Sequence, residues 1–520
     1  MPQLGPNVKR PGRRNPAITK NADIVLTSCE SQVQQAFVPE LPKESGAYFT
    51  PDAVVRSLVL WAVQNDRDRL LDPSCGSGHF LAVHPNCVGI EQNARSAAEA
   101  KRRAPGALVH EGDFFTWASE TNERFECAAG NPPFIRYQSF KGEVRERAQA
   151  LCTRLGADFS GLSSSWPPFL VAAASLLKPG GRMAFVVPAE IGHAPYSAPL
   201  IDYLVNHFSL LHVIAVREKL FPGLSEDCWL LRAENFGGST PEIHFSALEH
   251  FSYAEAPPRN AVRVSVKHWQ EFWNRRLRPF LLPRTVRDVY QELSAGTQRF
   301  GDLATIGIGY VTGANQFFHL RPSEADHWDI AEAFLQPTVR NGRALPSNRL
   351  TSADVQDWRA HDDPVLLLRL TKDAALTSGL KRYLGTERAK EARQAYKCRV
   401  RDPWYSVPDV RVPDFFLTYM SGRNVGLVRN DAGASCTNSL HAVQVKRRGA
   451  LSRIAVVRES PIFQLSSEIE GHPLGGGMLK LEPREAARIL MPQANGLEQI
   501  HNETIREGIA TLQSWRHYGE

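Results

Sequence analysis

Short apolar segments alternate with helical segments between residues 45 and 240, and this pattern restricts the possible fold more than any other feature of the sequence. The segments expected to form strands are Leu70–Leu71, Val88–Ile90, Ala107–Val109, Glu126–Ala128, Met183–Val187, Leu210–Val216 and Trp229–Leu231. Helical patterns lie between them, for example at 51–63, 94–102 and 168–177, and Lys178-Pro179-Gly180-Gly181 stops the last one. Such alternation predicts right-handed crossovers and a doubly wound, mostly parallel α/β sheet of seven strands.

The last two expected strands are connected differently from the others. Only about a dozen residues separate Val216 from Trp229, which leaves no room for a crossover helix. We therefore expect an antiparallel hairpin at the edge of the sheet, which a plain dinucleotide-binding fold does not require.

The chain of 520 residues is longer than one ordinary hydrophobic core, so we expect more than one domain. The pattern predicts a basic N-terminal arm at 1–44, the α/β domain at 45–240 and a bridge at 241–300. Beyond residue 300 glycines and prolines are frequent and aromatic residues come in pairs, which predicts a second, mixed α+β domain at 301–520 that is rich in loops.

Composition excludes several classes of protein. Hydrophobic residues make up 42% and charged residues 22%, the balance of a soluble globular chain, and the longest apolar run, 169–177, is far too short to span a bilayer. The N-terminus has no apolar signal segment, and the eight cysteines are scattered without a C-x-x-C pair. We expect a cytoplasmic protein with reduced thiols and no metal site. The net charge of +6 favours a polyanionic partner.

A turn of small residues follows the first expected strand. In Asp72-Pro73-Ser74-Cys75-Gly76-Ser77-Gly78 the two glycines let the backbone approach a ligand closely. Glu91 ends the next strand at the position where a Rossmann-like site binds ribose hydroxyls, and Asp113 ends the third strand, where it would accept a hydrogen bond from an adenine amino group. Phe114 would cover the purine face.

The phosphate-binding pattern G-x-G-x-x-G is incomplete, because Leu81 occupies the place of the third glycine. This favours a nucleoside cofactor without phosphates, such as S-adenosylmethionine, over a dinucleotide. Each piece alone also fits a plain tight turn or a helix cap; the order of the pieces along the chain favours the cofactor.

Asn131-Pro132-Pro133-Phe134 follows the fourth expected strand, at the edge where doubly wound sheets bind ligands. A proline turn is the structural alternative. The Asn131 side-chain oxygen and the Pro132 carbonyl are two acceptors that can take both hydrogens of an exocyclic amine and localise its lone pair for attack on a sulfonium methyl group. The prolines stiffen the turn, and Phe134 offers a π-face to a flipped base. No cysteine directly follows a proline, which argues against methylation at a ring carbon.

Together these motifs resemble the gamma-class N6-adenine DNA methyltransferases of restriction–modification systems, the TaqI type, which have a class I S-adenosylmethionine-dependent catalytic domain and a C-terminal target-recognition domain. Gly46-Ala47-Tyr48-Phe49-Thr50-Pro51 resembles the segment that holds the methionine end of the cofactor, and Phe221 matches a second aromatic that lies against the base; packing in the hairpin core is its alternative. The resemblance implies cofactor binding by Tyr48, Thr50, Pro51, Asp72, Pro73, Cys75, Gly76, Gly78, Glu91, Asp113, Phe114 and Asn131.

The second domain holds a basic stripe. Residues 381–401 contain eight Lys and Arg residues against Glu387 and Glu391, which fits either a solvated helix face or a surface that follows DNA phosphates. Arg136 and Tyr137 resemble a family extension of the tetrapeptide that either contacts DNA or packs the loop. The residues predicted to bind DNA are Arg136, Tyr137, Lys397, Arg399, Arg401, Trp404 and Tyr405.

The sequence therefore predicts a monomeric enzyme that methylates adenine in duplex DNA and whose companion endonuclease, if one exists, is a separate polypeptide. A non-catalytic DNA-recognition subunit is the main alternative, and the intact tetrapeptide argues against it. An RNA or protein N-methyltransferase that shares the N-P-P-F motif is a second alternative, against which the large C-terminal domain counts.

Overall fold

The computed structural model describes residues 50–161, 163–224, 226–458, 460–491 and 500–519. The expected N-terminal arm and Tyr48 lie outside these residues.

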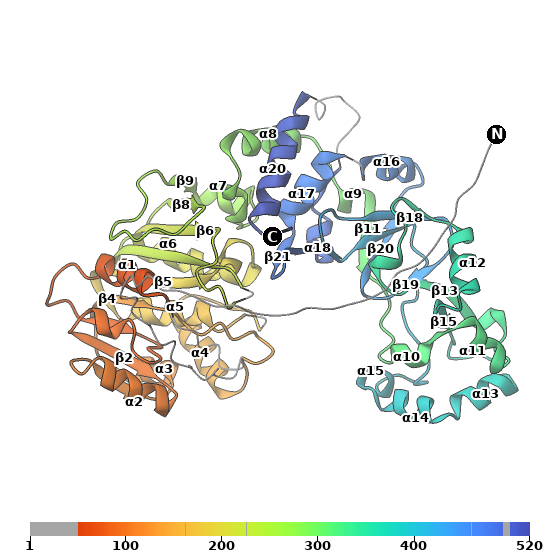
Figure 1. Cartoon of the computed structure of the whole chain (residues 1–520), viewed down its shortest axis with the longest axis horizontal. Coiled ribbons are helices and arrows are strands. Elements are labelled where there is room, and N and C mark those ends of the chain that lie inside the picture. The colour runs from red at the N-terminus through yellow and green to blue at the C-terminus, as the bar shows by residue number, and fades with distance from the viewer. Residues whose placement is uncertain (1–49, 162, 225, 459, 492–499, 520) are drawn as a thin grey trace, which may run out of the picture. The chain divides into compact units, whose positions relative to one another are not determined.

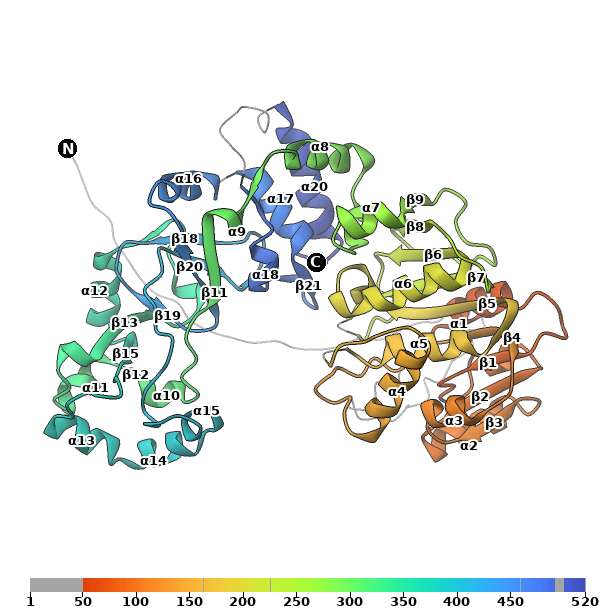
Figure 2. The ribbon, with the colours of Figure 1, turned by 180° about the vertical axis from the view of Figure 1, so that it is seen from behind.

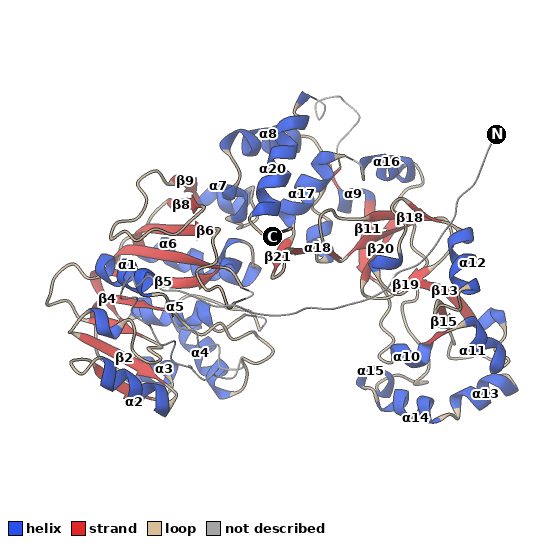
Figure 3. Ribbon diagram, in the orientation of Figure 1, coloured by secondary structure: helices blue, strands red, loops and turns tan. Residues whose placement is uncertain are grey.

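Nine strands of the described chain form one mixed sheet, in the order β3-β2-β1-β4-β5-β7-β6-β8-β9 (Figures 1 and 3). They are β1 (Leu70–Asp72), β2 (Cys87–Glu91), β3 (Leu108–Glu111), β4 (Phe125–Gly130), β5 (Leu177–Pro188), β6 (Phe208–Val216), β7 (Cys228–Phe236), β8 (Glu242–Leu248) and β9 (Val262–Ser265). Strands β1 to β5 pair in parallel, while β7 is antiparallel to both β5 and β6. The doubly wound α/β fold is confirmed, with nine strands in place of the seven expected.

The β6–β7 hairpin is antiparallel, as expected, but its position at the edge of the sheet is wrong. Strand β8 pairs in parallel with β6, and β9 pairs with β8 beyond it. The reason is burial, because Ile243 and Phe245 alternate along β8 and are both fully buried. Strands β8 and β9 fall in the stretch expected to be a bridge, and the predicted domain boundaries stay a prediction.

The segment expected to stop a helix also begins a strand. Helix α5 (Trp166–Ser175) ends before it, and β5 already starts at Leu177. The register opposite β4 shifts between Phe125 and Cys127, so the extra residues of β5 form an irregularity in which Gly180 has φ of +84°. Glycine adopts this conformation without steric cost.

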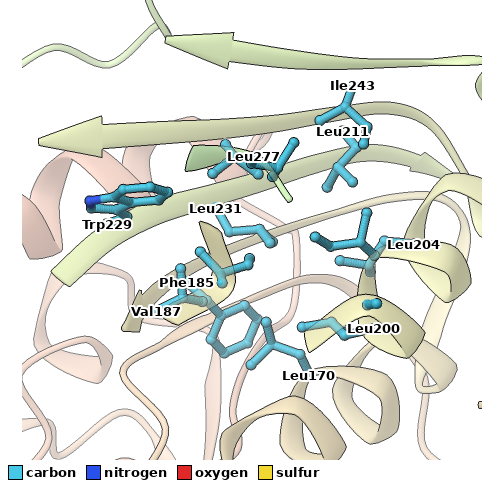
Figure 4. Packing of buried hydrophobic residues seen from close by; sticks show 14 of the residues in the cluster. Leu170, Phe185, Val187, Leu200, Leu204, Leu211, Trp229, Leu231, Ile243 and Leu277 are labelled. Atoms are coloured by element: carbon cyan, nitrogen blue, oxygen red, sulfur yellow. The ribbon is translucent and has the colours of Figure 1, made fainter. Parts of the chain in front are cut away.

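Helices cover both faces of the sheet. Helices α1 (Asp52–Ala62) and α2 (Ala94–Arg103) contribute to one buried cluster, and α3 (Phe114–Glu120), α4 (Glu143–Arg154), α5 and α6 (Ala198–His207) to the other. Side chains alternate between the clusters along β5, where Phe185 and Val187 face α5 and α6 while Ala184 and Val186 face the opposite way. Figure 4 shows the larger cluster, in which Leu277 from beyond the sheet packs near Leu211 and Leu231.

The C-terminal region contains smaller sheets, with strand orders β11-β20-β16-β18-β14, β12-β15-β13-β19, β17-β22-β21 and β10-β23. Their strands are β10 (Gln298–Arg299), β11 (Ala304–Ile308), β12 (His319–Leu320), β13 (Leu335–Val339), β14 (Arg349–Leu350), β15 (Leu366–Leu368), β16 (Phe415–Thr418), β17 (Met420–Ser421), β18 (Leu427–Asn430), β19 (Ser435–Cys436), β20 (Leu440–Val445), β21 (His472–Leu474), β22 (Met478–Lys480) and β23 (Leu490–Met491). Three hydrophobic clusters of buried residues lie in this region. Its short strands, helices and connecting loops agree with the expected mixed α+β architecture.

The remaining helices follow β9 in the chain, and the first of them lies against β9 of the large sheet (Figure 2). They are α7 (Val266–Glu271), α8 (Arg284–Ser294), α9 (Phe300–Leu303), α10 (Asn315–Phe318), α11 (Pro322–His327), α12 (Ser352–Ala360), α13 (Ser378–Leu384), α14 (Glu387–Gln394), α15 (Tyr396–Arg399), α16 (Ala450–Val457), α17 (Pro461–Glu470), α18 (Pro483–Ala486) and α20 (Asn502–Ser514). Helices α8 and α17 both pack against α20, although α8 is far from the other two in sequence (Figures 1 and 2). Within the described ranges, no helix has the length and apolar character needed to cross a membrane.

Buried ion pairs connect the segment after α7 to the C-terminal helices. Arg278 donates to Glu468 at 3.2 Å, and Arg516 donates to the same carboxylate at 2.8 Å. Arg276 donates to Glu485 at 2.9 Å, and the four side chains of these Arg278 and Arg276 pairs are at most 5% exposed. Such pairs fix one arrangement of distant segments, because a buried charge is costly without its partner.

Candidate active site

The carboxyl ends of four parallel strands bring the predicted cofactor residues to one edge of the sheet. Asp72 ends β1, Glu91 ends β2, Asp113 follows β3 by two residues and Asn131 directly follows β4. This edge is where open α/β sheets bind their ligands.

The glycine turn after β1 is held tightly. The Cys75 amide donates to the Ile90 carbonyl at 2.9 Å, which fixes the turn to β2. Gly76 and Gly78 have φ of +51° and +83°, and a Cβ atom at Gly78 would lie 2.9 Å from the Ala100 Cα in helix α2. The turn therefore requires glycine at both positions, and at Gly78 also for close packing.

Glu91 is hydrogen-bonded to this turn. One carboxylate oxygen accepts from the Gly76 amide at 2.9 Å and the other from the Asn93 amide at 2.7 Å. A carboxylate has about four acceptor positions, so hydroxyl groups of a ribose can still donate to it. The contacts hold the Glu91 side chain beside the glycine turn, as a ribose-binding carboxylate requires.

Asp72 lies close to Gly130, the residue before the tetrapeptide. Its carboxyl is 1% exposed, one oxygen accepts from the Ser74 amide at 3.2 Å, and the other oxygen is buried without a hydrogen-bond partner among the described residues. Burial raises the pKa of Asp72 to about 8. A Cβ atom at Gly130 would lie 2.7 Å from the Asp72 Oδ1, so the small residue before Asn131 makes room for this carboxyl.

Asp113 and Phe114 have structural roles at the start of α3. One Asp113 oxygen accepts from the Thr116 amide and hydroxyl, both at 2.9 Å, which is an N-cap. The Phe114 ring is 3% exposed and stacks on Phe169 with centroids 5.3 Å apart. The sequence predicted that this ring covers the purine of the cofactor. In the structure it is part of the hydrophobic core of the sheet domain.

Two acceptors of the tetrapeptide have no partner in the described chain. The Asn131 amide nitrogen donates to the Thr50 hydroxyl at 3.2 Å, while its Oδ1 is buried and receives no hydrogen bond. The Pro132 carbonyl likewise receives none from the described residues. Because a buried acceptor without a donor is costly, the Asn131 oxygen is a candidate for binding an external N–H group.

The backbone carbonyls on both sides of Pro132 are bonded. The Asn131 carbonyl accepts from the Ser74 hydroxyl at 3.4 Å, and the Pro133 carbonyl accepts from the Ser165 hydroxyl. Sequence reasoning did not select Ser165, because a serine before a helix is usually a cap. The pattern of bonded and free acceptors thus singles out the pair predicted to bind an amine.

The aromatic residues near the tetrapeptide are partly or largely buried. Phe134 is half-buried and packs against both hydrophobic clusters of the sheet, and Phe221 is 7% exposed. Phe221 belongs to the same cluster as Leu220 and Leu224 in the loop between β6 and β7. Both rings are therefore neighbours of one apolar cluster, with Phe134 the more exposed.

Arg136 and Tyr137 lie on the surface beyond the tetrapeptide. The Arg136 guanidinium donates to Glu226 at 2.6 Å, and the Tyr137 side chain is 40% exposed. Because Glu226 follows Phe221 in the β6–β7 loop, this ion pair links the two loops that carry Phe134 and Phe221.

Three families of known proteins match most of the chain. Residues 25–101 match the family N-6 DNA Methylase, residues 87–221 the Eco57I restriction-modification methylase, and residues 274–514 the C-terminal domain of type II methyltransferase M.Eco57I. The chain belongs to the DNA methyltransferases of restriction–modification systems. The resemblance seen in the sequence motifs is thereby confirmed.

Relatives of this methyltransferase are similar along nearly the whole chain. Type II methyltransferase M.AccI of Acinetobacter calcoaceticus is 19% identical over 93% of the chain and 92% of its own length. M.XamI of Xanthomonas campestris pv. amaranthicola is 23% identical over 88% of the chain and 86% of its own length. Among solved structures, the type IIL restriction-modification enzyme MmeI in complex with DNA is 12% identical, with a TM-score of 0.49, over 86% of this chain and 65% of that one.

The C-terminal region of the methyltransferase has a basic hollow of about 620 Å³ around α14 and α15. It is lined by Lys390, Arg393, Gln394, Arg399, Arg401, Asp402, Pro403 and Trp404. We call this surface the basic hollow. Lys390, Arg393 and Arg399 are exposed, as is the neighbouring Lys397. Exposed cations around a depression favour contact with a polyanion.

Some residues predicted to bind DNA are occupied elsewhere. The Arg401 guanidinium donates to the backbone carbonyls of Thr312 at 2.7 Å and Val311 at 2.6 Å. Trp404 and Tyr405 pack against a hydrophobic cluster, and Trp404 lies 5.3 Å from the Phe317 ring. Arg401 and Trp404 thus line the hollow while they are bonded or packed elsewhere, and of the exposed cations around it Lys390 is paired with Glu387 at 2.6 Å.

Proposed function

We propose that this methyltransferase transfers the methyl group of S-adenosylmethionine to the N6 amino group of an adenine flipped out of duplex DNA. The observation that carries the proposal is a pair of acceptors at the carboxyl edge of the sheet, the Asn131 Oδ1 and the Pro132 carbonyl, which receive no hydrogen bond from the described residues. Two acceptors match the two hydrogens of an exocyclic amine.

The tetrapeptide would activate the amine by geometry. The lone pair of an adenine amino nitrogen is delocalised into the ring; acceptors on both N–H bonds favour a tetrahedral nitrogen whose lone pair is localised. S-adenosylmethionine supplies a methyl group bonded to a positively charged sulfur. The nitrogen forms the new C–N bond as the S–C bond breaks, its electron pair stays on sulfur, and the nitrogen then releases one proton. Positioning and electrostatic complementarity account for such a rate enhancement.

The residues of the sheet edge fit this cofactor. The glycine turn gives a close backbone approach, and Glu91 is held where ribose hydroxyls can donate to it. The Asp72 oxygen that has no hydrogen-bond partner among the described residues is a further polar group open to a ligand. The Thr50 hydroxyl accepts from the Asn131 amide nitrogen, and the other predicted cofactor residues adjoin these groups in sequence, namely Pro51, Pro73 and Cys75. Only one oxygen of Asp113 is used by its cap contacts, so the other could bind the cofactor.

Duplex DNA is the proposed substrate. Its phosphates would contact the exposed cations of the basic hollow, with Arg136 and Tyr137 beside the tetrapeptide as further contacts. We propose that Phe134 stacks on the flipped base and that Phe221 packs on its other side. We further propose that the enzyme is a monomer and that any companion endonuclease is a separate polypeptide.

Two single variants test the division of roles. Asn131→Ala should abolish transfer of labelled methyl groups to DNA while the cofactor dissociation constant stays within about threefold, because Asn131 acts on the amine. Glu91→Ala should instead weaken cofactor binding, measured by isothermal titration calorimetry. Wild-type turnover of Asn131→Ala would contradict the proposal.

The same assay separates the alternative functions. A non-catalytic recognition subunit would bind DNA without binding S-adenosylmethionine, and an RNA or protein methyltransferase would label those substrates in place of DNA. Long-read sequencing of DNA from cells that express the chain would identify the modified base and its sequence context. Modified cytosine at these sites would refute adenine as the target.

A further inference from the structure

We propose that Ser165 is a positioning residue that holds the Pro132 carbonyl in the direction needed to accept from the target amine. This inference rests on the proposed function and adds a residue outside the sequence motifs. It comes from the hydrogen bonds of one serine that is fully buried at the start of helix α5.

Ser165 is bonded to the loop of the tetrapeptide at three atoms. Its hydroxyl donates to the Pro133 carbonyl and accepts from the Ile135 amide at 3.0 Å. Its own amide donates to the Ile135 carbonyl at 3.0 Å. Ser165, at the start of α5, thus holds the backbone on both sides of Phe134, the residue that follows the two prolines.

The hydroxyl group does not serve its usual purpose at this position. A serine before a helix normally accepts from the amides of the second or third helical residue. Here these residues are Pro167 and Pro168, which have no N–H, and the Ser165 side chain makes no cap hydrogen bond. The sequence therefore leaves the hydroxyl to the tetrapeptide.

The prolines explain why an external brace is effective. The ring of Pro133 fixes its φ, and the Ser165 hydroxyl holds its carbonyl, so the peptide plane between Pro132 and Pro133 is held from its C-terminal side. The Ser74 hydroxyl holds the Asn131 carbonyl on the other side. The Pro132 carbonyl lies between these two anchored groups and keeps its direction, although it receives no hydrogen bond from any residue that the structure describes.

The test is the single-turnover rate of methyl transfer by Ser165→Ala at saturating S-adenosylmethionine and DNA. Because a misplacement of about 1 Å can cost roughly a hundredfold in rate, we expect the rate to fall by about ten- to a hundredfold. The dissociation constants of cofactor and DNA should stay within about twofold of wild type. Ser165→Thr, which keeps the hydroxyl, should recover most of the rate.

Ser466→Ala is the matched control. Ser466 is also fully buried and accepts from a backbone amide, that of Leu490, at 2.9 Å, but it lies in helix α17. It should lose thermal stability comparably to Ser165→Ala while it keeps the wild-type rate. If Ser165→Ala does not fold, Ser165→Cys provides the same test, because a thiol is a weak donor.

An unchanged rate in Ser165→Ala would overturn the inference, as would equal losses in the alanine and threonine variants, or a loss explained by weaker cofactor binding. A rate loss of the same size in Ser466→Ala would also overturn it, since stability alone would then suffice. Wild-type protein that transfers no methyl group to adenine would refute the proposed function and the inference together. A wild-type enzyme that is active on adenine, with Ser165→Ala equally active, would refute the inference alone.

Discussion

Among single residues, Asp72 has an electrostatic environment that opposes its charge. Its carboxyl is fully buried at the end of β1, and burial raises its pKa to about 8, with a smaller contribution from the negative charge of Glu91. The folded protein therefore keeps Asp72 protonated at pH values where the unfolded chain has already lost the proton.

The stability of the protein without cofactor should consequently fall as the pH rises. Between about pH 4 and pH 8 the unfolded state binds fewer protons at Asp72 than the folded state, which lowers the free energy of unfolding by at most about 1.4 kcal/mol per pH unit. Asp72→Asn should remove this dependence and be more stable than wild type at pH 8, with a smaller difference at pH 5. Urea unfolding of both proteins at these two pH values measures it, and parallel stability curves would contradict the prediction.

Asp113 has two possible roles that one pair of variants separates. Its observed role is the N-cap of helix α3, and Asp113→Ala should therefore lower the free energy of unfolding by about 1 kcal/mol. Asp113→Asn keeps a capping side chain and should restore most of that stability. If Asp113 also binds the adenine of the cofactor through its carboxylate, both variants should weaken S-adenosylmethionine binding in calorimetry. Unchanged affinity in both would leave Asp113 with the cap alone.

Helix α15 and the residues directly after it present cations in two different environments. Lys397 and Arg399 are exposed beside the basic hollow, whereas the Arg401 guanidinium is bonded to two backbone carbonyls. Three basic residues within five positions of sequence thus differ in what they can contact.

Salt dependence of DNA binding should distinguish them. Each phosphate contact contributes about 0.9 to the slope of log K against log salt, so Lys397→Ala with Arg399→Ala should reduce the slope by about 2. Arg401→Ala should mainly lower thermal stability, because two carbonyls lose their donor. Fluorescence anisotropy with duplex DNA at several salt concentrations provides the measurement, and an unchanged slope in the double variant would exclude this surface from the DNA interface.

At the scale of the whole molecule, Glu468 joins segments that are far apart in sequence. Its carboxylate accepts from Arg278 and from Arg516, and all three side chains are at most 3% exposed. Burial lowers the pKa of Arg278 to about 10, so this guanidinium remains charged at neutral pH. Both cations depend on the single buried carboxylate.

Glu468→Gln should therefore destabilise the protein by about 3–5 kcal/mol, because it leaves buried positive charge uncompensated. Glu387→Gln is the control: it removes the partner of Lys390 in a pair at 2.6 Å whose side chains are largely exposed, and should change stability by less than about 1 kcal/mol. Chemical denaturation of both variants measures the difference. Equal, small effects would contradict the structural importance of the buried network.

The sequence by itself determined the elements whose formation depends on neighbouring residues. The alternation of strands and helices, the turn at Gly76 and Gly78 and the tetrapeptide at Asn131 are local patterns, because backbone preferences and side-chain periodicity act over a few residues. Their order along parallel strands was enough to predict a common edge, and the structure places them there.

Only the tertiary structure decided what depends on partners far away in the chain. Strand β8 takes the place next to β6, Arg401 is bonded to carbonyls about 90 residues away, and Ser165 is bonded across 32 residues to Pro133. Phe114 turns into the core because Phe169 offers a stacking surface. Whether a side chain is buried or hydrogen-bonded in this way depends on which distant residues the folded chain brings together. A pattern of a few neighbouring residues does not contain that information.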